Sequence, residues 1–125
     1  SAFMFSQLII PEMKKKRKGN IVFINSIAGR QPFSYSAAYV SSKFALRGFA
    51  SSLREELRED NIKVMSVYPG AINTNFWDNI NEEFSKDEML TSESIANFIL
   101  QAITTPDNAV VEEIVIRRTA GDMRF

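Results

Sequence analysis

The chain has 125 residues, of which 45% are hydrophobic, and its 15 basic side chains balance its 15 acidic ones. This is the composition of an ordinary folded domain, and its neutrality gives no overall attraction to nucleic acid or to a membrane surface. The chain has no cysteine and no histidine, which excludes disulfides, thiolate nucleophiles, Cys/His zinc sites and serine–histidine triads. Acid–base chemistry near neutral pH therefore depends on a tyrosine, lysine, aspartate or glutamate.

The first element in chain order is a helix over residues 2–17, predicted by apolar side chains at helical spacing. Pro11 lies inside it and predicts a kink. The basic run Lys14–Lys18 follows at its end, where cations are favourable, and Gly19 is predicted to cap the helix. The run fits a solvated helix end, and a nucleic-acid or localisation patch is the alternative.

A strand and a long helix come next. Residues 21–24 form a short apolar run, which predicts a buried parallel strand. Residues 37–59 carry the longest helical pattern. Its expected core face comprises Leu46, Phe49, Ala50, Leu53 and Leu57, and its expected solvent face comprises Arg54, Glu55, Arg58 and Glu59.

The second half of the chain repeats this alternation. A strand is predicted over residues 62–68, a helix from a Thr91 cap to about Ile103, and a last strand over residues 110–116. Strands separated by helices need crossover connections, so the pattern predicts an α/β fold with a parallel sheet covered on both faces.

Three polar side chains form a candidate catalytic set. Ser26 follows the strand at 21–24, Tyr39 lies near the start of the helix at 37–59, and Lys43 comes four residues after Tyr39. That spacing puts the phenol and the ammonium on one helix face. A neighbouring ammonium favours the ionised form of a phenol, so Tyr39 can serve as a general acid or base, and the Ser26 hydroxyl can hold the substrate oxygen.

Three segments, Ile24–Gly29, Tyr39–Leu46 and Val67–Thr74, agree in order and spacing with one family pattern. Through them the chain resembles the classical short-chain dehydrogenases/reductases. The resemblance implies a doubly wound, Rossmann-like parallel sheet, of which residues 1–125 would form the C-terminal half as a single partial domain. The family's glycine-rich phosphate turn, the residue that separates NAD from NADP and the catalytic asparagine are absent from this chain. We therefore expect the strand at 21–24 to lie at an unpaired edge, and the chain alone to be unstable and inactive.

The resemblance also implies roles for individual residues. Ser26 would orient and polarise the substrate oxygen, Tyr39 would exchange a proton with it, and Lys43 would assist Tyr39 and bond the nicotinamide ribose. Taken singly, the three residues could instead be a strand-end cap, a packing aromatic and a solvated lysine. The cofactor contacts implied in the same way are those of Tyr39, Lys43, Pro69, Gly70, Ile72 and Thr74, and no metal is implied.

The segment 75–90 is predicted to be a substrate loop that closes over the site. Within it Phe76 and Trp77 are candidate walls of the substrate pocket, beside Ser26 and Tyr39, although ordinary packing explains two aromatics as well. For Thr74 a helix cap is the alternative to a cofactor contact.

The resemblance implies an oxidoreductase that transfers a hydride between NAD or NADP and a small-molecule carbonyl/alcohol substrate. A catalytically idle relative that serves as a binding or regulatory subunit is the alternative, and a truncated product that persists as a partner of another chain is a third. A homodimer or homotetramer through helices 2–17 and 37–59 is implied, with Phe3, Phe5, Phe44 and Phe49 as candidates for the apolar contact. No nucleic-acid or membrane partner is expected, and the expected location is cytoplasmic, since no apolar run approaches the ~20 residues of a membrane span.

Overall fold

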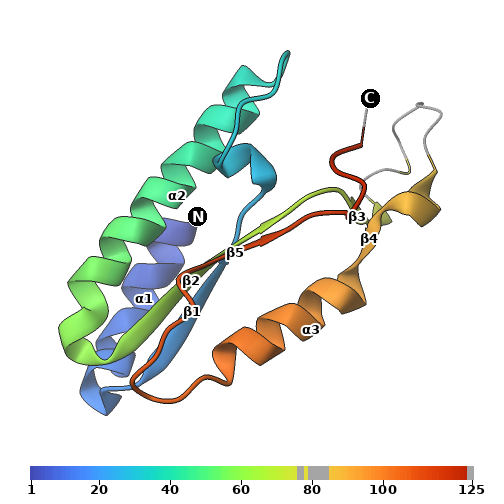
Figure 1. Cartoon of the computed structure of the whole chain (residues 1–125). Coiled ribbons are helices and arrows are strands. Elements are labelled where there is room, and N and C mark those ends of the chain that lie inside the picture. The colour runs from blue at the N-terminus through green and yellow to red at the C-terminus, as the bar shows by residue number, and fades with distance from the viewer. Residues whose placement is uncertain (76–77, 79–84, 124–125) are drawn as a thin grey trace.

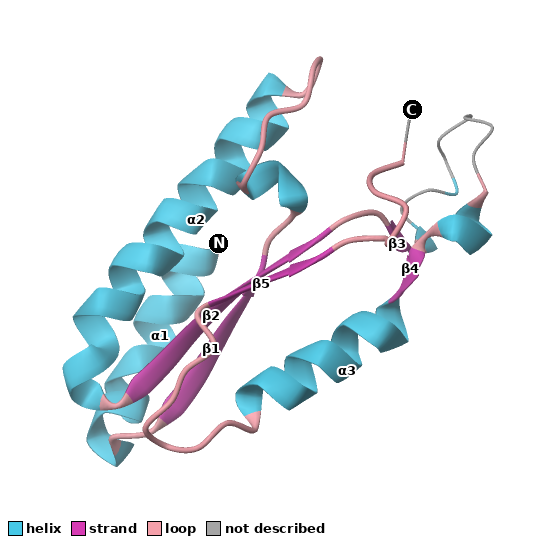
Figure 2. Cartoon of the chain, viewed as in Figure 1, coloured by secondary structure: helices cyan, strands magenta, loops and turns pink. Residues whose placement is uncertain are grey.

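The computed structural model describes residues 1–75, 78 and 85–123. Its main sheet has three parallel strands in the order β1–β2–β5, namely β1 (Gly19–Ile24), β2 (Ile62–Pro69) and β5 (Glu113–Ile116). Three helices pack on it, α1 (Ala2–Lys16), α2 (Ala37–Leu57) and α3 (Ser92–Ile103). Helices α1 and α2 lie on one face and α3 on the other (Figure 1). The predicted α/β class, the parallel sheet and its coverage on both faces are confirmed, and Figure 2 shows the alternation of helix and strand.

The sheet separates two hydrophobic cores, one on each face. The core under α1 and α2 contains Ile21, Phe23, Ala50, Leu53, Leu57, Ile62 and Val64. The core under α3 contains Met65, Val67, Ile95 and Ile116. Central strand β2 contributes to both, because successive side chains point to opposite faces and both faces are covered. This explains why β2 is a nearly continuous apolar run.

Helix α1 begins and ends with side-chain and backbone caps. The Ser1 side chain accepts from the amide of Met4, and the helix runs without interruption through Pro11 to Lys16. The predicted cap at Gly19 is wrong: Arg17 adopts the left-handed conformation (φ 48°) that ends the helix, and Gly19 is already the first residue of β1. A non-glycine residue can take this conformation singly, at a modest steric cost.

The prediction that Arg54 lies on the solvent face of α2 is wrong. Its side chain is buried, with only 6% of the residue's surface exposed. The Nε atom donates to the carbonyl of Val64 at 2.8 Å, and an Nη atom donates to the carbonyl of Glu112 at 2.9 Å. A guanidinium can be buried when its donors are satisfied, and here it joins the starts of β2 and β5.

The other element boundaries shift by a few residues. Helix α2 ends at Leu57, and the 3₁₀ turn η2 (Arg58–Asp60) replaces its predicted last turn. The last strand begins at Glu113 instead of residue 110. The cap at Thr91 is confirmed, since its hydroxyl accepts from the Ser94 amide at 3.1 Å.

A second, two-stranded sheet was not predicted. Strand β3 (Ile72–Asn73) pairs in parallel with β4 (Leu90–Thr91). Each strand has only two residues, which is too short to produce a period-2 pattern. This pairing ties the segment after β2 to the start of α3 (Figure 1).

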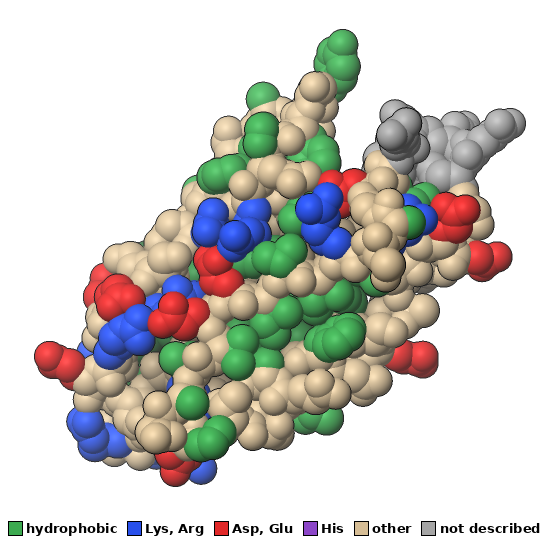
Figure 3. Space-filling model, in the orientation of Figure 1, with side chains coloured by type: hydrophobic (Ala, Val, Ile, Leu, Met, Phe, Trp, Pro, Cys, Tyr) green, Lys and Arg blue, Asp and Glu red, His purple; other side chains and the backbone are tan. Residues whose placement is uncertain are grey.

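The surface carries both charges and apolar side chains. Basic and acidic groups lie side by side over the face drawn in Figure 3. Phe3, Phe5 and Phe44 are exposed on α1 and α2, whereas Phe49 belongs to the interior: its ring packs edge-to-face on Phe23, with centroids 5.8 Å apart. None of the helices in the described part of the chain is long and apolar enough to cross a membrane.

Candidate active site

The candidate site lies at the carboxyl edge of the parallel sheet. Ile24 at the end of β1 is in register with Val67 of β2, and Pro69 at the end of β2 is in register with Ile116 of β5. The strands therefore end at a common edge, where α/β sheets bind their ligands. The residues that follow β1 and β2 emerge there.

Ser26 opens a tight turn at the end of β1. Its Oγ accepts from the Ala28 amide at 3.1 Å and so caps the 3₁₀ turn η1 (Ile27–Gly29). Its carbonyl accepts from the Gly29 amide at 2.8 Å. Ser26 therefore does act as a cap, as the alternative interpretation predicted. Capping occupies only a lone pair of the hydroxyl oxygen and leaves its proton unused. The hydroxyl proton makes no hydrogen bond with any residue that the structure describes, so it stays available.

Tyr39 and Lys43 occupy successive turns at the start of α2, as their spacing predicts. The Lys43 Nζ lies 5.5 Å from the centroid of the Tyr39 ring. Tyr39 is 51% exposed, so its ring is not buried against the described residues. Within the described ranges, neither the phenolic oxygen nor the ammonium has a hydrogen-bond or ion-pair partner. Both polar groups can therefore bind a molecule at the sheet edge.

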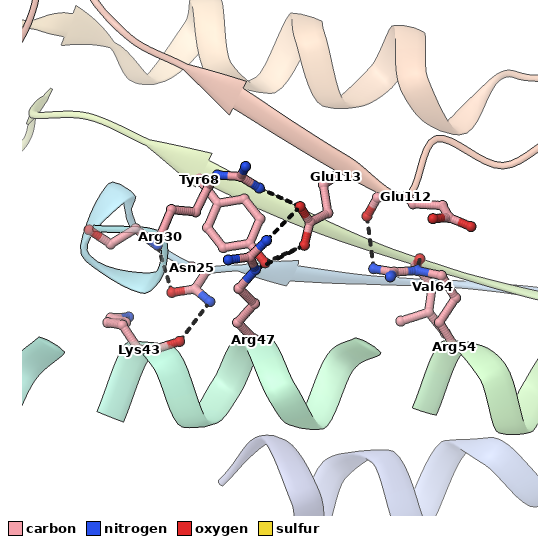
Figure 4. A network of polar contacts seen from close by, with 10 residues as sticks. Asn25, Arg30, Lys43, Arg47, Arg54, Val64, Tyr68, Glu112 and Glu113 are labelled. Carbon is pink, nitrogen blue, oxygen red and sulfur yellow. Dashed lines mark hydrogen bonds and ion pairs between the residues drawn. The ribbon is translucent and has the colours of Figure 1, made fainter. Parts of the chain in front are cut away.

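Asn25 connects these two parts of the site. The buried side-chain amide donates from Nδ2 to the Lys43 carbonyl at 3.1 Å, while Oδ1 accepts from the Ser26 amide at 2.8 Å (Figure 4). Its own backbone amide donates to the Val67 carbonyl at 2.8 Å. One residue thus joins the Ser26 turn, helix α2 and strand β2.

The expected cofactor-binding segment follows β2. Pro69 is the last residue of the strand, and the Gly70 amide donates to the Ile116 carbonyl at 2.8 Å. Ile72 lies in β3, and the Thr74 side chain is exposed just beyond that strand. Pro69 and Gly70 share the carboxyl edge with Asn25, as the parallel register requires.

The predicted substrate walls, Phe76 and Trp77, lie outside the described residues, as do residues 79–84 of the predicted loop at 75–90.

A model of the short chain dehydrogenase family matches residues 1–85. The chain belongs to the short-chain dehydrogenase family. The predicted resemblance is therefore confirmed, and it covers the whole segment from α1 through Ser26, Tyr39 and Lys43 to Thr74.

Curated members of this short-chain dehydrogenase family include two informative relatives. The chain is 35% identical to the sepiapterin reductase of Chlorobaculum tepidum, over 98% of this chain and 50% of the relative. It is 34% identical to the NADP-dependent 3-hydroxy acid dehydrogenase of Schizosaccharomyces pombe, over 89% of this chain and 46% of the relative. The chain spans about half the length of the curated relatives it matches.

Solved short-chain dehydrogenase structures have the same fold. A 4-hydroxyisoleucine dehydrogenase complexed with NADH is 30% identical and superposes with a TM-score of 0.76, over 96% of this chain and 55% of that one. A β-ketoacyl-[ACP] reductase from Bacteroides thetaiotaomicron is 27% identical, with a TM-score of 0.77 over 92% of this chain and 47% of that one. The Rossmann-like arrangement is thus shared across the chain.

A charged cluster lies beside the site of this short-chain dehydrogenase. Glu113 on β5 accepts from Arg47 Nε at 3.2 Å, from the Tyr68 hydroxyl at 3.0 Å and from Arg30 (Figure 4). Partial burial raises the pKa of Glu113, but the hydrogen bonds from Arg47 and Tyr68 and the charges of Arg47 and Arg30 outweigh it and hold that pKa below its ordinary value. The carboxylate is therefore ionised at neutral pH.

Sequence reasoning missed both Asn25 and this cluster. No local pattern marks Asn25 as a connector, because its Lys43 partner is 18 residues away and is brought to it by the fold. Glu113 lies in an apolar strand run, Val110–Ile116, where a carboxylate is unusual. A carboxylate in such a run could have indicated the cluster, because a charge in a largely apolar strand needs partners of opposite charge.

Proposed function

We propose that this chain contributes the proton-transfer half of a nicotinamide-dependent oxidoreductase site that interconverts a carbonyl and an alcohol. One observation carries the proposal. The Ser26 hydroxyl proton, the Tyr39 phenol oxygen and the Lys43 ammonium all lack a hydrogen-bond or ion-pair partner among the described residues, and they lie at the sheet edge where such folds bind ligands. Family membership and the names of the relatives support the reaction class.

Each of the three side chains has a distinct role in this proposal. The Ser26 hydroxyl donates its free proton to the substrate oxygen and holds it in place, while a lone pair of the same hydroxyl accepts from the Ala28 amide. The Tyr39 phenol gives its proton to that oxygen when a carbonyl is reduced and removes it when an alcohol is oxidised. The Lys43 ammonium, 5.5 Å from the Tyr39 ring centroid, stabilises the negative charge left on the phenol oxygen.

The donor set fits a nicotinamide cofactor, NAD or NADP. The free Lys43 ammonium suits the hydroxyls of a ribose, and the Tyr39 phenol adds a second contact. The Pro69–Gly70 backbone, the Ile72 backbone and the Thr74 hydroxyl follow β2 at the same edge and are assigned to the nicotinamide end. When bound, the cofactor supplies or accepts the hydride, and the protein orients the reactants. Solved relatives complexed with NADP or with NADH support this assignment.

The remaining assignments follow from the same family. Residues 1–125 form one part of a larger doubly wound domain, which is supported by their coverage of about half of the relatives and by the place of β1 at the end of the strand order. The loop at 75–90, with Phe76 and Trp77, covers the substrate. A homodimer or homotetramer forms through the exposed phenylalanines of α1 and α2, and the location is cytoplasmic.

The test follows absorbance of NADH and NADPH in the full-length protein against a panel of ketones, aldehydes and alcohols. The wild type is expected to turn over, and Tyr39→Phe is expected to lose about 10²–10⁴-fold in kcat. Tyr35→Phe is the matched control, because Tyr35 is fully exposed in the loop before α2, and it should keep the wild-type rate. A Tyr39→Phe variant that retains its rate would refute the proton-transfer role. Cofactor binding without turnover would favour the idle relative.

A further inference from the structure

Glu113 connects two segments that are far apart in the sequence and that both lead to the proposed catalytic residues. Its carboxylate contacts Arg30, which follows the Ser26 turn, and Arg47, which lies on α2. Figure 4 shows both guanidinium groups directed at this one side chain, which projects from β5. The Glu113 contact thus bridges separate elements across the sheet.

The Arg30 arm belongs to the rigid turn that Ser26 begins. Arg30 is four residues after Ser26, and its amide donates to the Ile27 carbonyl at 2.9 Å. Ile27, Ala28 and Gly29 between them are all buried. Because this turn is short, buried and internally hydrogen-bonded, holding Arg30 against Glu113 also restrains the direction in which the Ser26 hydroxyl points.

The Arg47 arm belongs to the helix face that carries the other two residues. Tyr39, Lys43 and Arg47 are spaced four residues apart on α2, so they share one face. Arg47 donates to both oxygens of Glu113, at 3.2 Å from Nε and 3.4 Å from an Nη atom. This two-point contact restrains the rotation of α2 about its axis, as well as its distance from β5.

Tyr68 completes the cluster. Its side chain is fully buried between the arms, and its hydroxyl donates to Glu113 at 3.0 Å. The guanidinium carbons of Arg30 and Arg47 lie 5.4 Å and 5.8 Å from the centroid of its ring, within cation–π range. The phenol therefore fixes the orientation of both arginines around the carboxylate.

We infer that Glu113 is a positioning residue, which sets the Ser26 hydroxyl relative to the Tyr39 phenol by holding the Ser26 turn through Arg30 and helix α2 through Arg47. This inference rests on the proposed function for its catalytic consequence. Its structural part, the coupling of the turn to the helix through one carboxylate, can be measured without cofactor.

The experiment compares Glu113→Gln with Glu112→Gln in the full-length protein. Glu112 is the neighbouring residue, and its carboxylate pairs with Arg58 just after α2, at the opposite end from Tyr39. Without cofactor, amide hydrogen exchange of the peptide spanning residues 26–31 should accelerate in Glu113→Gln and not in Glu112→Gln. With cofactor and substrate, kcat should fall about 10- to 100-fold in Glu113→Gln while the Kd of NAD(P)H changes less than about threefold, because misplacement affects the reacting atoms most. A larger primary isotope effect on kcat from deuterated cofactor is expected as well, since the chemical step would become more limiting.

The outcomes separate this inference from the proposed function. If the wild type is inactive, the proposed function is refuted. If hydrogen exchange of residues 26–31 nevertheless accelerates only in Glu113→Gln, the structural coupling through Glu113 is supported. An active Glu113→Gln with wild-type kcat and wild-type exchange would overturn the inference, and so would equal losses in the two variants. If Glu113→Gln does not fold, Arg30→Met and Arg47→Met each remove one of the two contacts of Glu113. If both arginines act through Glu113, the double variant should lose no more kcat than the stronger single variant.

Discussion

The side-chain amide of Asn25 donates to the backbone carbonyl of Lys43 at 3.1 Å, which ties the end of β1 to the second turn of α2. Asn25 is only 5% exposed, and its carbonyl oxygen accepts from the Ser26 amide. Two hydrogen bonds of one buried amide thus join the Ser26 turn to the Lys43 turn, in addition to the contacts of Glu113.

Replacing Asn25 should destabilise the protein and disturb the site together. Asn25→Ala leaves the half-buried Ser26 amide without its acceptor, and the free energy of unfolding should fall by about 1–3 kcal/mol. Asn25→Asp keeps that acceptor but places a carboxylate oxygen against the Lys43 carbonyl, so it should also destabilise. Urea unfolding measures both, with Asn108→Ala in the exposed turn before β5 as the control within about 0.5 kcal/mol of the wild type. An Asn25→Ala variant as stable as the control would show that the amide bridge contributes nothing.

The two glycines Gly29 and Gly48 should respond in opposite directions to alanine. A Cβ on Gly29 would lie 2.8 Å from Oδ1 of Asn25, and that side chain is held in place by its own hydrogen bonds. We expect Gly29→Ala to cost about 1–3 kcal/mol, the range for overpacking. A Cβ on Gly48, within α2, meets nothing within 4 Å, so Gly48→Ala should stabilise by about 0.5–1 kcal/mol through helix propensity. Thermal unfolding of the two variants measures the change in stability of each. A Gly29→Ala variant as stable as the wild type would contradict the close approach of Asn25 to this position.

Arg54 and Arg58 lie one helical turn apart but should differ in their contribution to stability. Arg54→Met removes the donors to the buried Val64 carbonyl and to the partly buried Glu112 carbonyl, and the free energy of unfolding should fall by about 2–4 kcal/mol. Arg58→Met removes exposed ion pairs with Glu55 and Glu112, which water and salt screen, so it should destabilise the protein much less than Arg54→Met. Denaturant unfolding in buffers of low and high salt separates the two, since only the exposed pairs are screened. Equal losses would contradict the assignment of Arg54 to the interior.

The stabilisation from Glu113 should depend on pH with a defined sign. The pKa of this carboxyl is lower in the folded protein than its ordinary value, so folding favours the ionised form. Its contribution is complete above the ordinary pKa of about 4.3 and is lost as the pH falls through the lower folded value. Glu113→Gln should therefore be less stable than the wild type by roughly 1–3 kcal/mol at pH 7, and the difference should shrink on acidification below about pH 4. Unfolding curves of both proteins at a series of pH values test this. If the stability difference between wild type and Glu113→Gln grew in acid, the pKa of Glu113 would be raised by folding instead of lowered.

Much of this molecule follows from patterns that are local in sequence. The apolar spacing in residues 37–57 specifies a helix, because packing one helical stripe requires period 3.6. The short apolar runs at Gly19–Ile24 and Ile62–Pro69, separated by that helix, specify parallel strands, because such a crossover returns the chain in the same direction. The pairing of Tyr39 with Lys43 is also local, since four residues make about one helical turn.

What the sequence determined by itself was therefore the order of elements, the parallel sheet, the family and the catalytic candidates on α2. The tertiary structure alone decided which charged side chains lie inside. Periodicity could not separate buried Arg54 from exposed Arg58, because the burial of Arg54 depends on the carbonyls of Val64 in β2 and of Glu112 just before β5, which accept from its guanidinium. Nor could it pair Glu113 with Arg30, 83 residues away, because a carboxylate finds its partners only after the strands and the helix have packed.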